Sequence, residues 1–357
     1  LNMRTGNTEK IGKVFYVRGK KQEEAAAVVA GDIGAVAKLN NTNTGDTLCA
    51  PVRPVTLPGI DFERPCLSMA VCAKNKGDED KIAAGLARLA EEDPTISVET
   101  DPETREMILS GLGDQHLDVV VSKLKSKFGV EVTLAVPKVA YRETIRKKVK
   151  VQGRHKKQSG GHGQFGDVWI EFEPCDSDGL IFEEAVFGGS VPKNYFPAVE
   201  KGLKESARHG VLAGFPMVGV KATLVDGSYH PVDSSDMAFK TAASLAYKAG
   251  IPQANPVLLE PIGLLTVTVP NASTGDIMGD ITKRRGRVLG MEPDGENHAL
   301  TRIEAYVPMA EIGDYNTMLR ASTQGRGSYQ IRFDSYEEAP ANVAQKVMET
   351  YKAETEE

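Results

Sequence analysis

Residues 114–136 read DQHLDVVVSKLKSKFGVEVTLAV, and this stretch combines a helix, the signal that ends it and a strand. The apolar residues recur at helical spacing on one face: Leu117, Val120, Val121, Leu124 and Phe128. Gly129 follows them, and glycine readily adopts the left-handed conformation that ends a helix. Residues 130–136 alternate apolar and polar side chains, which predicts the last strand of a domain.

The preceding residues complete a domain together with this helix and strand. A strand is expected at 67–73, a helix at 78–91 with Asp78 as a possible cap, and a hairpin at 95–100 and 105–110. The resulting order is βαββαβ, the ferredoxin-like arrangement. The same order recurs near the end of the chain, in strands 264–269, 287–291, 299–307 and 329–333 and helices 274–283 and 315–322.

The region between these two modules has a different pattern. Two long alternating strands are expected at 141–158 and 165–173, followed by helices at 196–209 and 234–249 with a strand at 219–225 between them. Residues 1–57 contain short strands and turns, including 13–17 and 35–39, which fit part of a β-barrel. Val343, Val347 and Tyr351 recur at helical spacing and predict a last amphipathic helix.

We therefore predict an α+β fold with four regions. They are the C-terminal part of a β-barrel (1–57), a ferredoxin-like domain (58–136), an elongated α+β arm domain (137–255) and a second ferredoxin-like domain (256–338). The helix at 339–353 is expected to pack near the arm domain.

Composition excludes several classes of protein. No apolar run approaches the roughly 18 residues that a membrane span needs. The cysteines (Cys49, Cys66, Cys72 and Cys175) form no CxxC or Cys/His cluster, so we expect free thiols, a cytoplasmic protein and no metal site. The first residues lack the apolar core of a signal peptide. Because the chain begins with Leu1 rather than Met, we expect it to be a fragment.

Charge is distributed unevenly along the chain. The formal net charge is -6, yet residues 142–157 contain eight lysines or arginines and a single acid, Glu143. This basic stem leads into QSGGHGQFG at 158–166, which has four glycines. A basic stem that ends in a glycine-rich loop predicts a protrusion directed at phosphates, because glycine lets the backbone approach a partner closely.

The glycine-rich loop allows three interpretations. A nucleotide-phosphate cradle normally lies between a strand and a helix N-terminus, whereas this loop lies between two expected strands. The others are a flexible hairpin tip and a tip that reaches into nucleic acid. In the last case His162, between glycines, could donate to phosphate, a 2'-hydroxyl or a base edge. His230, after another strand, would by itself be a simple loop histidine.

Two further basic segments allow both a structural and a binding interpretation. The run KRRGR at 283–287 closes a helix, where cations also suit the helix dipole. The segment QGRGS at 324–328 fits either a loop that contacts RNA backbone or a plain helix C-cap.

Nothing in the sequence predicts an enzyme site. NKGD at 75–78 matches the guanine-reading motif, but the chain has no GxxxxGK[ST] phosphate loop, so a chance match is the better interpretation. A nucleotide-using enzyme built on 75–78 and 160–166 remains the competing hypothesis. No Ser/His/Asp set, metal cluster or paired carboxylates indicate a catalytic centre.

Seven short motifs, taken in order, resemble bacterial elongation factor G and span nearly the whole chain. They are ARLAEEDP (87–94), YRETI (141–145), GGHGQFG (160–166), DGSYH (226–230), VDSS (232–235), RRG (284–286) and QGRG (324–327). The resemblance implies a five-domain ribosomal GTPase. This chain would hold the end of its second domain and its third to fifth domains, and GTP and Mg²⁺ would bind in a domain outside it, leaving no cofactor here.

The resemblance also implies partners and site residues. The arm would enter the small-subunit decoding centre, contact the tRNA–mRNA duplex and promote translocation, and the fifth domain would meet large-subunit rRNA. The partners would thus be both ribosomal subunits, and a monomer is expected. The implied arm tip consists of Ser159, Gly160, Gly161, His162, Gly163, Gln164 and His230. The implied contacts to RNA backbone are Arg154, Lys156, Lys157, Arg284, Arg285 and Arg326.

The sequence departs from the family pattern at a few positions. His162 stands where the family usually has Arg, and Phe165 where it has Tyr. Residues 114–117 read DQHL where Glu-Leu-His-Leu is usual. These differences leave room for a specialised paralogue that recycles, rescues or protects ribosomes.

Overall fold

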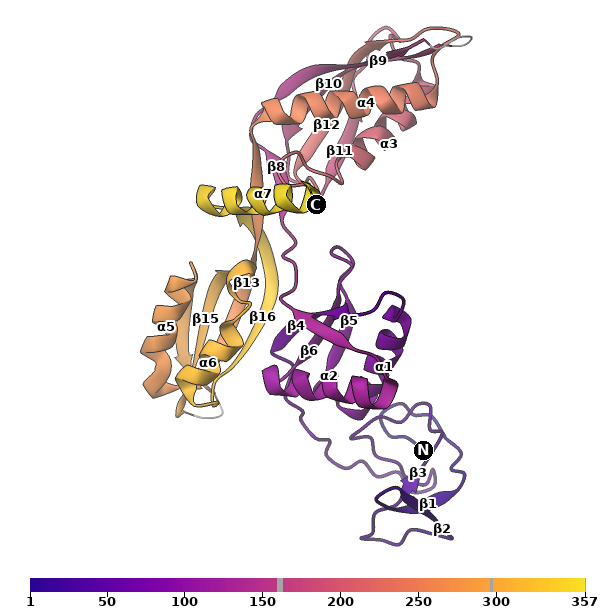
Figure 1. The fold of residues 1–357 in the computed structure, drawn as a ribbon, viewed down its shortest axis with the longest axis vertical. Helices are drawn as coiled ribbons and strands as arrows, with labels where there is room; N and C mark the ends of the chain where they lie inside the picture. The colour runs from indigo at the N-terminus through magenta and orange to yellow at the C-terminus, as the bar shows by residue number, and fades with distance from the viewer. Residues whose placement is uncertain (159–162, 296–297, 357) are drawn as a thin grey trace. The chain divides into compact units, whose positions relative to one another are not determined.

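The computed structural model describes residues 1–158, 163–295 and 298–356, with side-chain surroundings described up to 352 (Figure 1). The fold is mixed α+β with several separate sheets, as predicted. The chain divides into two compact units, Leu1–Pro137 and Lys138–Glu357. Within the described part of the chain, no helix has the length and apolar character needed to cross a membrane.

The N-terminal region has a small antiparallel sheet. Its strands, in the order β2-β1-β3, are β1 (Val14–Arg18), β2 (Lys21–Ala25) and β3 (Ala35–Val36). Two of these strands were predicted, although β3 is shorter than the expected 35–39. The sequence KQEEA of β2 has no β-branched or aromatic residue, so its pairing with β1 was missed. The described residues form no closed barrel.

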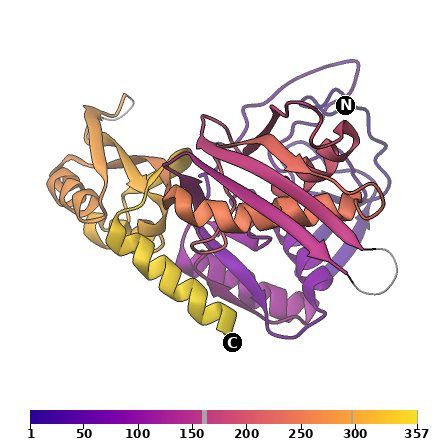
Figure 2. The same cartoon turned by 90° about the horizontal axis from the view of Figure 1, so that it is seen from above.

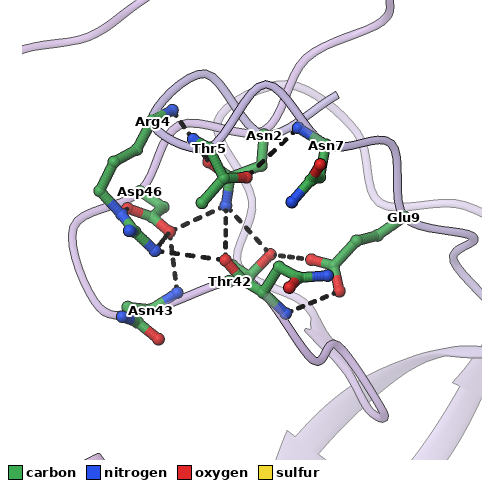
Figure 3. A network of polar contacts seen from close by, with 9 residues as sticks. Asn2, Arg4, Thr5, Asn7, Glu9, Thr42, Asn43 and Asp46 are labelled. Carbon is green, nitrogen blue, oxygen red and sulfur yellow. Dashed lines mark hydrogen bonds and ion pairs between the residues drawn. The ribbon is translucent and has the colours of Figure 1, made fainter.

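Polar contacts stabilise the start of the chain (Figure 3). Asn2 is fully buried and donates to Asp46 Oδ2 at 2.8 Å, while Arg4 binds both carboxylate oxygens of Asp46 at 2.6 and 2.9 Å. The hydrogen bond from Arg4 is the largest cause of a strongly lowered pKa of Asp46. Glu9 accepts the backbone N–H groups of residues 40 and 41. Two segments about 40 residues apart are therefore joined by charge-assisted hydrogen bonds.

The first ferredoxin-like domain has the predicted βαββαβ order. Its elements are β4 (Leu67–Ala73), α1 (Glu79–Glu92), β5 (Ser97–Thr100), β6 (Met107–Gly111), α2 (Asp114–Phe128) and β7 (Val132–Ala135). The sheet order is β5-β6-β4-β7. Gly129 ends α2 at φ 70°, as expected. Asp78 occupies the N-cap position of α1, but its side chain makes no capping bond and pairs with Lys81 at 3.0 Å instead.

The second ferredoxin-like domain repeats this order. Its elements are β13 (Pro256–Pro270), α5 (Thr274–Lys283), β14 (Arg287–Pro293), β15 (Leu300–Pro308), α6 (Tyr315–Thr323) and β16 (Ser328–Glu338). The sheet order is β14-β15-β13-β16. β13 begins well before the predicted residue 264, because its first residues pair with a strand of the preceding region, β8 (Arg142–Ile145).

The arm domain is a four-stranded sheet with two helices. Its elements are β9 (Val149–Lys157), β10 (Gln164–Pro174), β11 (Leu180–Glu184), α3 (Phe196–Ser206), β12 (Val220–Ser228) and α4 (Asp236–Gly250), and the sheet order is β11-β12-β10-β9. The prediction of one strand over 141–158 was wrong. The chain changes sheets at Arg146, whose N–H donates to Ala254 and Asn255 instead of continuing the ladder.

Helix α4 lies directly on strands β9 and β10, which form an antiparallel hairpin (Figure 2). A Cβ built at Gly153 in β9 would lie 2.1 Å from the carbonyl oxygen of Ala242, and one at Gly166 in β10 would lie 2.6 Å from that of Ala238. The helix backbone therefore contacts the sheet backbone at two points, and only glycine leaves the necessary space.

A buried carboxylate connects β8 to the loop before β12. Glu143 is fully buried, and its side chain accepts the backbone N–H groups of Leu212, Ala213 and Phe215 at 2.8 to 3.2 Å. Several hydrogen bonds to one carboxylate offset the cost of removing its charge from water.

The last helix, α7 (Ala341–Glu356), covers the same region. Its residues Val343 and Val347 pack in a small cluster that includes Tyr141, Phe215 and Leu258. The helix therefore packs with side chains that precede β8 in the sequence, as Tyr141 does, and side chains that follow it, as Phe215 and Leu258 do.

We predict that Gly153→Ala lowers the free energy of unfolding of the arm domain by about 1–3 kcal/mol, because the new methyl group forces α4 away from β9. Trp169, the single tryptophan, lies in β10 and reports on this domain by fluorescence during urea denaturation. Gly179→Ala is the matched control, since a Cβ there meets nothing within 4 Å. An unchanged midpoint for Gly153→Ala would contradict the close packing.

Candidate nucleic-acid interface

The hairpin of β9 and β10 has two chemically different faces. Residues that point toward the helices are buried, including Val151, Val168, Ile170 and Phe172. Alternate positions of β9 carry Lys150, Arg154 and Lys156, and Lys148 directly precedes the strand. The second part of the basic stem expected from the sequence is therefore a row of cations along one face of the sheet, whereas its first residues form β8 in another sheet.

At the base of this row the charges are neutralised within the protein. Lys148 contacts Glu171 at 2.8 Å and Glu173 at 3.1 Å, and Lys221 contacts Glu173 at 2.5 Å. The hydrogen bonds from Lys221 and then Lys148 lower the pKa of Glu173. Pairs of this kind on adjacent strands leave little net charge for a ligand.

Toward the turn of the hairpin the cations are not neutralised. Arg154, Lys156 and Lys157 are exposed, and none forms an ion pair with any residue that the structure describes. Asp167, opposite Arg154, is only 7% exposed and accepts from Gln152 and Ser228, both at 2.8 Å. Positive charge is thus concentrated at the turn end, which suits a polyanion.

A second loop, residues 229–235, is held beside this end by Ser234. The Ser234 hydroxyl donates to the carbonyl oxygen of Phe165 at 2.9 Å and accepts the N–H of His230 at 2.9 Å. The N–H of Phe165 donates to the carbonyl of Asp233 at 2.8 Å. The two loops therefore form one hydrogen-bonded surface.

Asp233 and His230 extend this surface. The N–H of Gly163 donates to Asp233 Oδ1 at 2.9 Å. His230 Nδ1 lies 3.2 Å from both the N–H nitrogen and Oδ2 of Asp233, so this ring nitrogen is engaged within the loop. The His230 side chain is 52% exposed, which leaves Nε2 available to a ligand. The His230 ring packs edge-on against the Phe165 ring, with 6.5 Å between the ring centroids. The guanidinium group of Arg154 lies over the Phe165 ring, 5.6 Å from its centroid.

The structure brings together some of the predicted tip residues. Gly163, Gln164 and His230 lie on this surface, with the stem residues Arg154, Lys156 and Lys157 beside them. Ser159, Gly160, Gly161 and His162 lie outside the described residues. The loop connects two strands, which is not the strand-to-helix setting of a phosphate cradle.

Arg284 and Arg285 have partners inside the protein. Arg284 is 12% exposed and donates to Asp280 at 2.6 Å and Asp314 at 2.5 Å. Arg285 binds both oxygens of the buried Glu260 at 2.7 and 2.8 Å. These contacts give both arginines a structural role, and their binding of RNA stays a prediction.

Arg326 is exposed in the turn between α6 and β16. Gln324 at φ 55° and Gly325 at φ 78° close the helix, and both N–H groups donate to Arg320. The segment is therefore a helix C-cap, one of its two interpretations, and it presents one arginine to solvent.

Sequence reasoning missed Asp233 and Ser234 as organisers of the site. The motif VDSS was noted, but its hydrogen bonds to Gly163 and Phe165 join residues about 70 positions apart. The described residues contain no group of three or more His, Cys, Asp or Glu that could hold a metal ion.

Comparison with known families accounts for most of the chain. Residues 62–136 match the model for elongation factor G domain III, residues 137–255 match domain IV, and residues 257–347 match the elongation factor G C-terminus. The chain belongs to the elongation factor G family. The basic hairpin and the His230 loop both lie in the domain IV match.

A solved structure supports this assignment. A crystal structure from Thermus thermophilus is 42% identical to the chain, with a TM-score of 0.79, over 96% of this chain and 51% of that one. The chain thus spans about half the length of the solved relative.

We predict that Asp233→Ala exposes the amide of Gly163, because its acceptor is lost. Hydrogen exchange measured by mass spectrometry should become faster in peptides that cover residues 163–166. The matched control is Asp236→Ala, an exposed carboxylate in the first turn of α4. Equal exchange in both variants would show that Asp233 does not hold the loop.

Proposed function

We propose that this chain is the ribosome-binding part of a translation elongation factor. In this proposal the end of the arm domain contacts the tRNA–mRNA duplex at the decoding centre and promotes translocation. GTP hydrolysis in a G domain outside these residues, with its Mg²⁺, supplies the driving force. The observation that carries the proposal is the convergence at one end of a domain IV sheet of the His230 loop and three exposed cations, which form no ion pair with the described residues.

The chemistry of the surface suits RNA backbone. Arg154, Lys156 and Lys157 offer donors to phosphates, and His230 Nε2 offers a hydrogen-bonding group to a phosphate, a 2'-hydroxyl or a base edge. The N–H groups of Gly163 and Phe165 are already used within the protein, so side chains make the contacts.

Translocation requires position rather than covalent chemistry at this surface. A protein element that occupies the vacated site blocks the return of the tRNA, and a preference of a few kcal/mol is enough to dominate the population. The backbone contacts of α4 at Gly153 and Gly166 support such a role, because they limit bending of the hairpin relative to the helix.

The second ferredoxin-like domain is proposed to meet large-subunit rRNA. Arg326 is its best candidate contact, since the side chain is exposed and the capped turn fixes its backbone. Arg284 and Arg285 contribute through the ion pairs that hold α5 to neighbouring elements.

We predict that binding of this chain to 70S ribosomes weakens with salt in a manner set by the stem cations. Each lost phosphate contact should reduce the slope of log K against log salt by roughly 0.7 to 0.9. The double variant Lys156→Ala/Lys157→Ala should therefore show a shallower slope than the wild type, measured by sedimentation across a potassium chloride series.

Lys148→Ala, directly before the same strand, provides the control. Its ammonium group is already paired with Glu171 and Glu173, so the slope should change less than in the double variant. Ribosome binding that is absent at low salt, or independent of salt, would overturn the proposal. Micromolar binding of GTP or ATP to this chain in calorimetry would instead favour a nucleotide-using enzyme.

A further inference from the structure

A third loop of the arm domain carries an aromatic side chain that the protein leaves uncovered. Phe187, between β11 and α3, is 96% exposed. Its neighbours along the chain are anchored: Val186 packs against the domain core, and Val191 is 1% exposed. A phenylalanine that contacts almost nothing within its own domain is an unusual use of a large apolar group.

The backbone keeps this side chain outside. Gly188 and Gly189 both have φ of 73°, a left-handed conformation that other residues adopt at a cost. Residues 187–189 are exposed, whereas Val186 is half-buried and Val191 is buried, so the turn between these two valines lies on the domain surface. Phe187 lies at the start of this exposed turn.

Hydrogen bonds place this loop at the same end of the domain as the basic hairpin. Just before the loop, the N–H of Ala185 donates to Leu224 at 2.8 Å. Just after it, the hydroxyl of Tyr195 donates to the carbonyl oxygen of Ser234 at 3.3 Å. Ser234 also bonds to Phe165, so it joins the 3-10 turn that follows this loop, residues 193–195, to the hairpin.

We propose that Phe187 stacks on an unpaired base of the RNA that binds this end of the arm. The inference rests on the proposed function and adds a residue that contacts bases to a surface otherwise described by its phosphate-binding cations. Aromatic rings stack on any base, because every base has a π face. A Phe held outside the domain offers such a face without the cost of first exposing it.

The surrounding charges favour RNA over an apolar protein partner. Lys193 is exposed in the 3-10 turn that follows this loop, and Arg154, Lys156 and Lys157 lie on β9, at the opposite edge of the same sheet. The carboxylates nearby are partly occupied: Glu183 lies 3.5 Å from Lys221, and Asp226 Oδ1 accepts the N–H of Gly227. Glu184, at the end of β11, is exposed and adds one negative charge beside the loop.

A fluorescence experiment on the full chain tests the stacking. Phe187→Trp in a Trp169→Phe background leaves one indole, at the loop, and the chain is titrated with an unstructured oligoadenylate RNA at low salt. Stacking should quench this indole strongly as RNA binds. The control is Phe333→Trp in the same background, because Phe333 is 52% exposed on β16 in another domain and should show little quenching.

Affinity measurements separate stacking from simple apolar contact. Phe187→Leu should weaken RNA binding roughly tenfold, whereas Phe187→Trp should retain it, and neither should change the salt slope. Phe333→Leu should have no effect.

Three results would overturn the inference. They are no RNA binding at low salt, binding without quenching at position 187, and equal affinity of Phe187→Leu and wild type. Normal RNA affinity in Phe187→Leu with a loss in Phe187→Ala would indicate a simple apolar contact with the RNA instead of stacking. Since ribosome binding and its salt slope are measured separately, failure here is distinguishable from failure of the proposed function.

Discussion

The arm domain depends on direct contact between the backbone of α4 and the backbones of β9 and β10. Gly153 and Gly166 leave room for helix carbonyl groups where any side chain would collide. Helices usually pack on sheets through side chains, which can change rotamer and slide. Here the contact has no such freedom, so the helix and hairpin resist relative movement. Ser235, whose side chain caps α4, directly follows Ser234, which binds the hairpin. The same few residues therefore begin the helix and organise the tip.

The charged residues in and beside β9 differ between the base of the hairpin and its turn. At the base, directly before β9 begins, Lys148 is matched by two glutamates on β10, and these ion pairs link the two chain segments. Near the turn, the only carboxylate on the facing strand, Asp167, is occupied by Gln152 and Ser228. One strand thus has a neutralised end and a charged end. This arrangement keeps nonspecific attraction to polyanions away from the base and concentrates it where His230 and Phe187 are exposed.

Local patterns predicted most of the fold, because most of its helices and strands can be recognised from the spacing of apolar residues within short segments. The spacing of Leu117, Val120 and Leu124 and the glycine after α2 required no knowledge of the remaining chain. The failures involve distant partners. The division of residues 141–158 depends on pairing of β8 with the start of β13, more than a hundred positions away. Likewise, the basic residues could be found by counting, but their partners could not: Arg285 meets Glu260, and Lys148 meets Glu171, through tertiary contacts. For the site, short motifs in the sequence indicated the glycine-rich loop and His230. The hydrogen bonds of Asp233 and Ser234 and the exposure of Phe187 depend on the tertiary structure, so the sequence did not indicate them.

The pairing of β8 with β13 also bears on how force could pass through this unit. Strand β8 belongs to the sheet of the second ferredoxin-like domain, yet its residue Glu143 binds three backbone N–H groups of the arm domain. A buried carboxylate in that position is costly to separate from its donors, since both the charge and the N–H groups would be left without partners. Helix α7 packs on the same region through Val343 and Val347. The junction is therefore a hydrogen-bonded and apolar joint rather than a flexible linker, and movement of the sheet should carry the base of the arm with it.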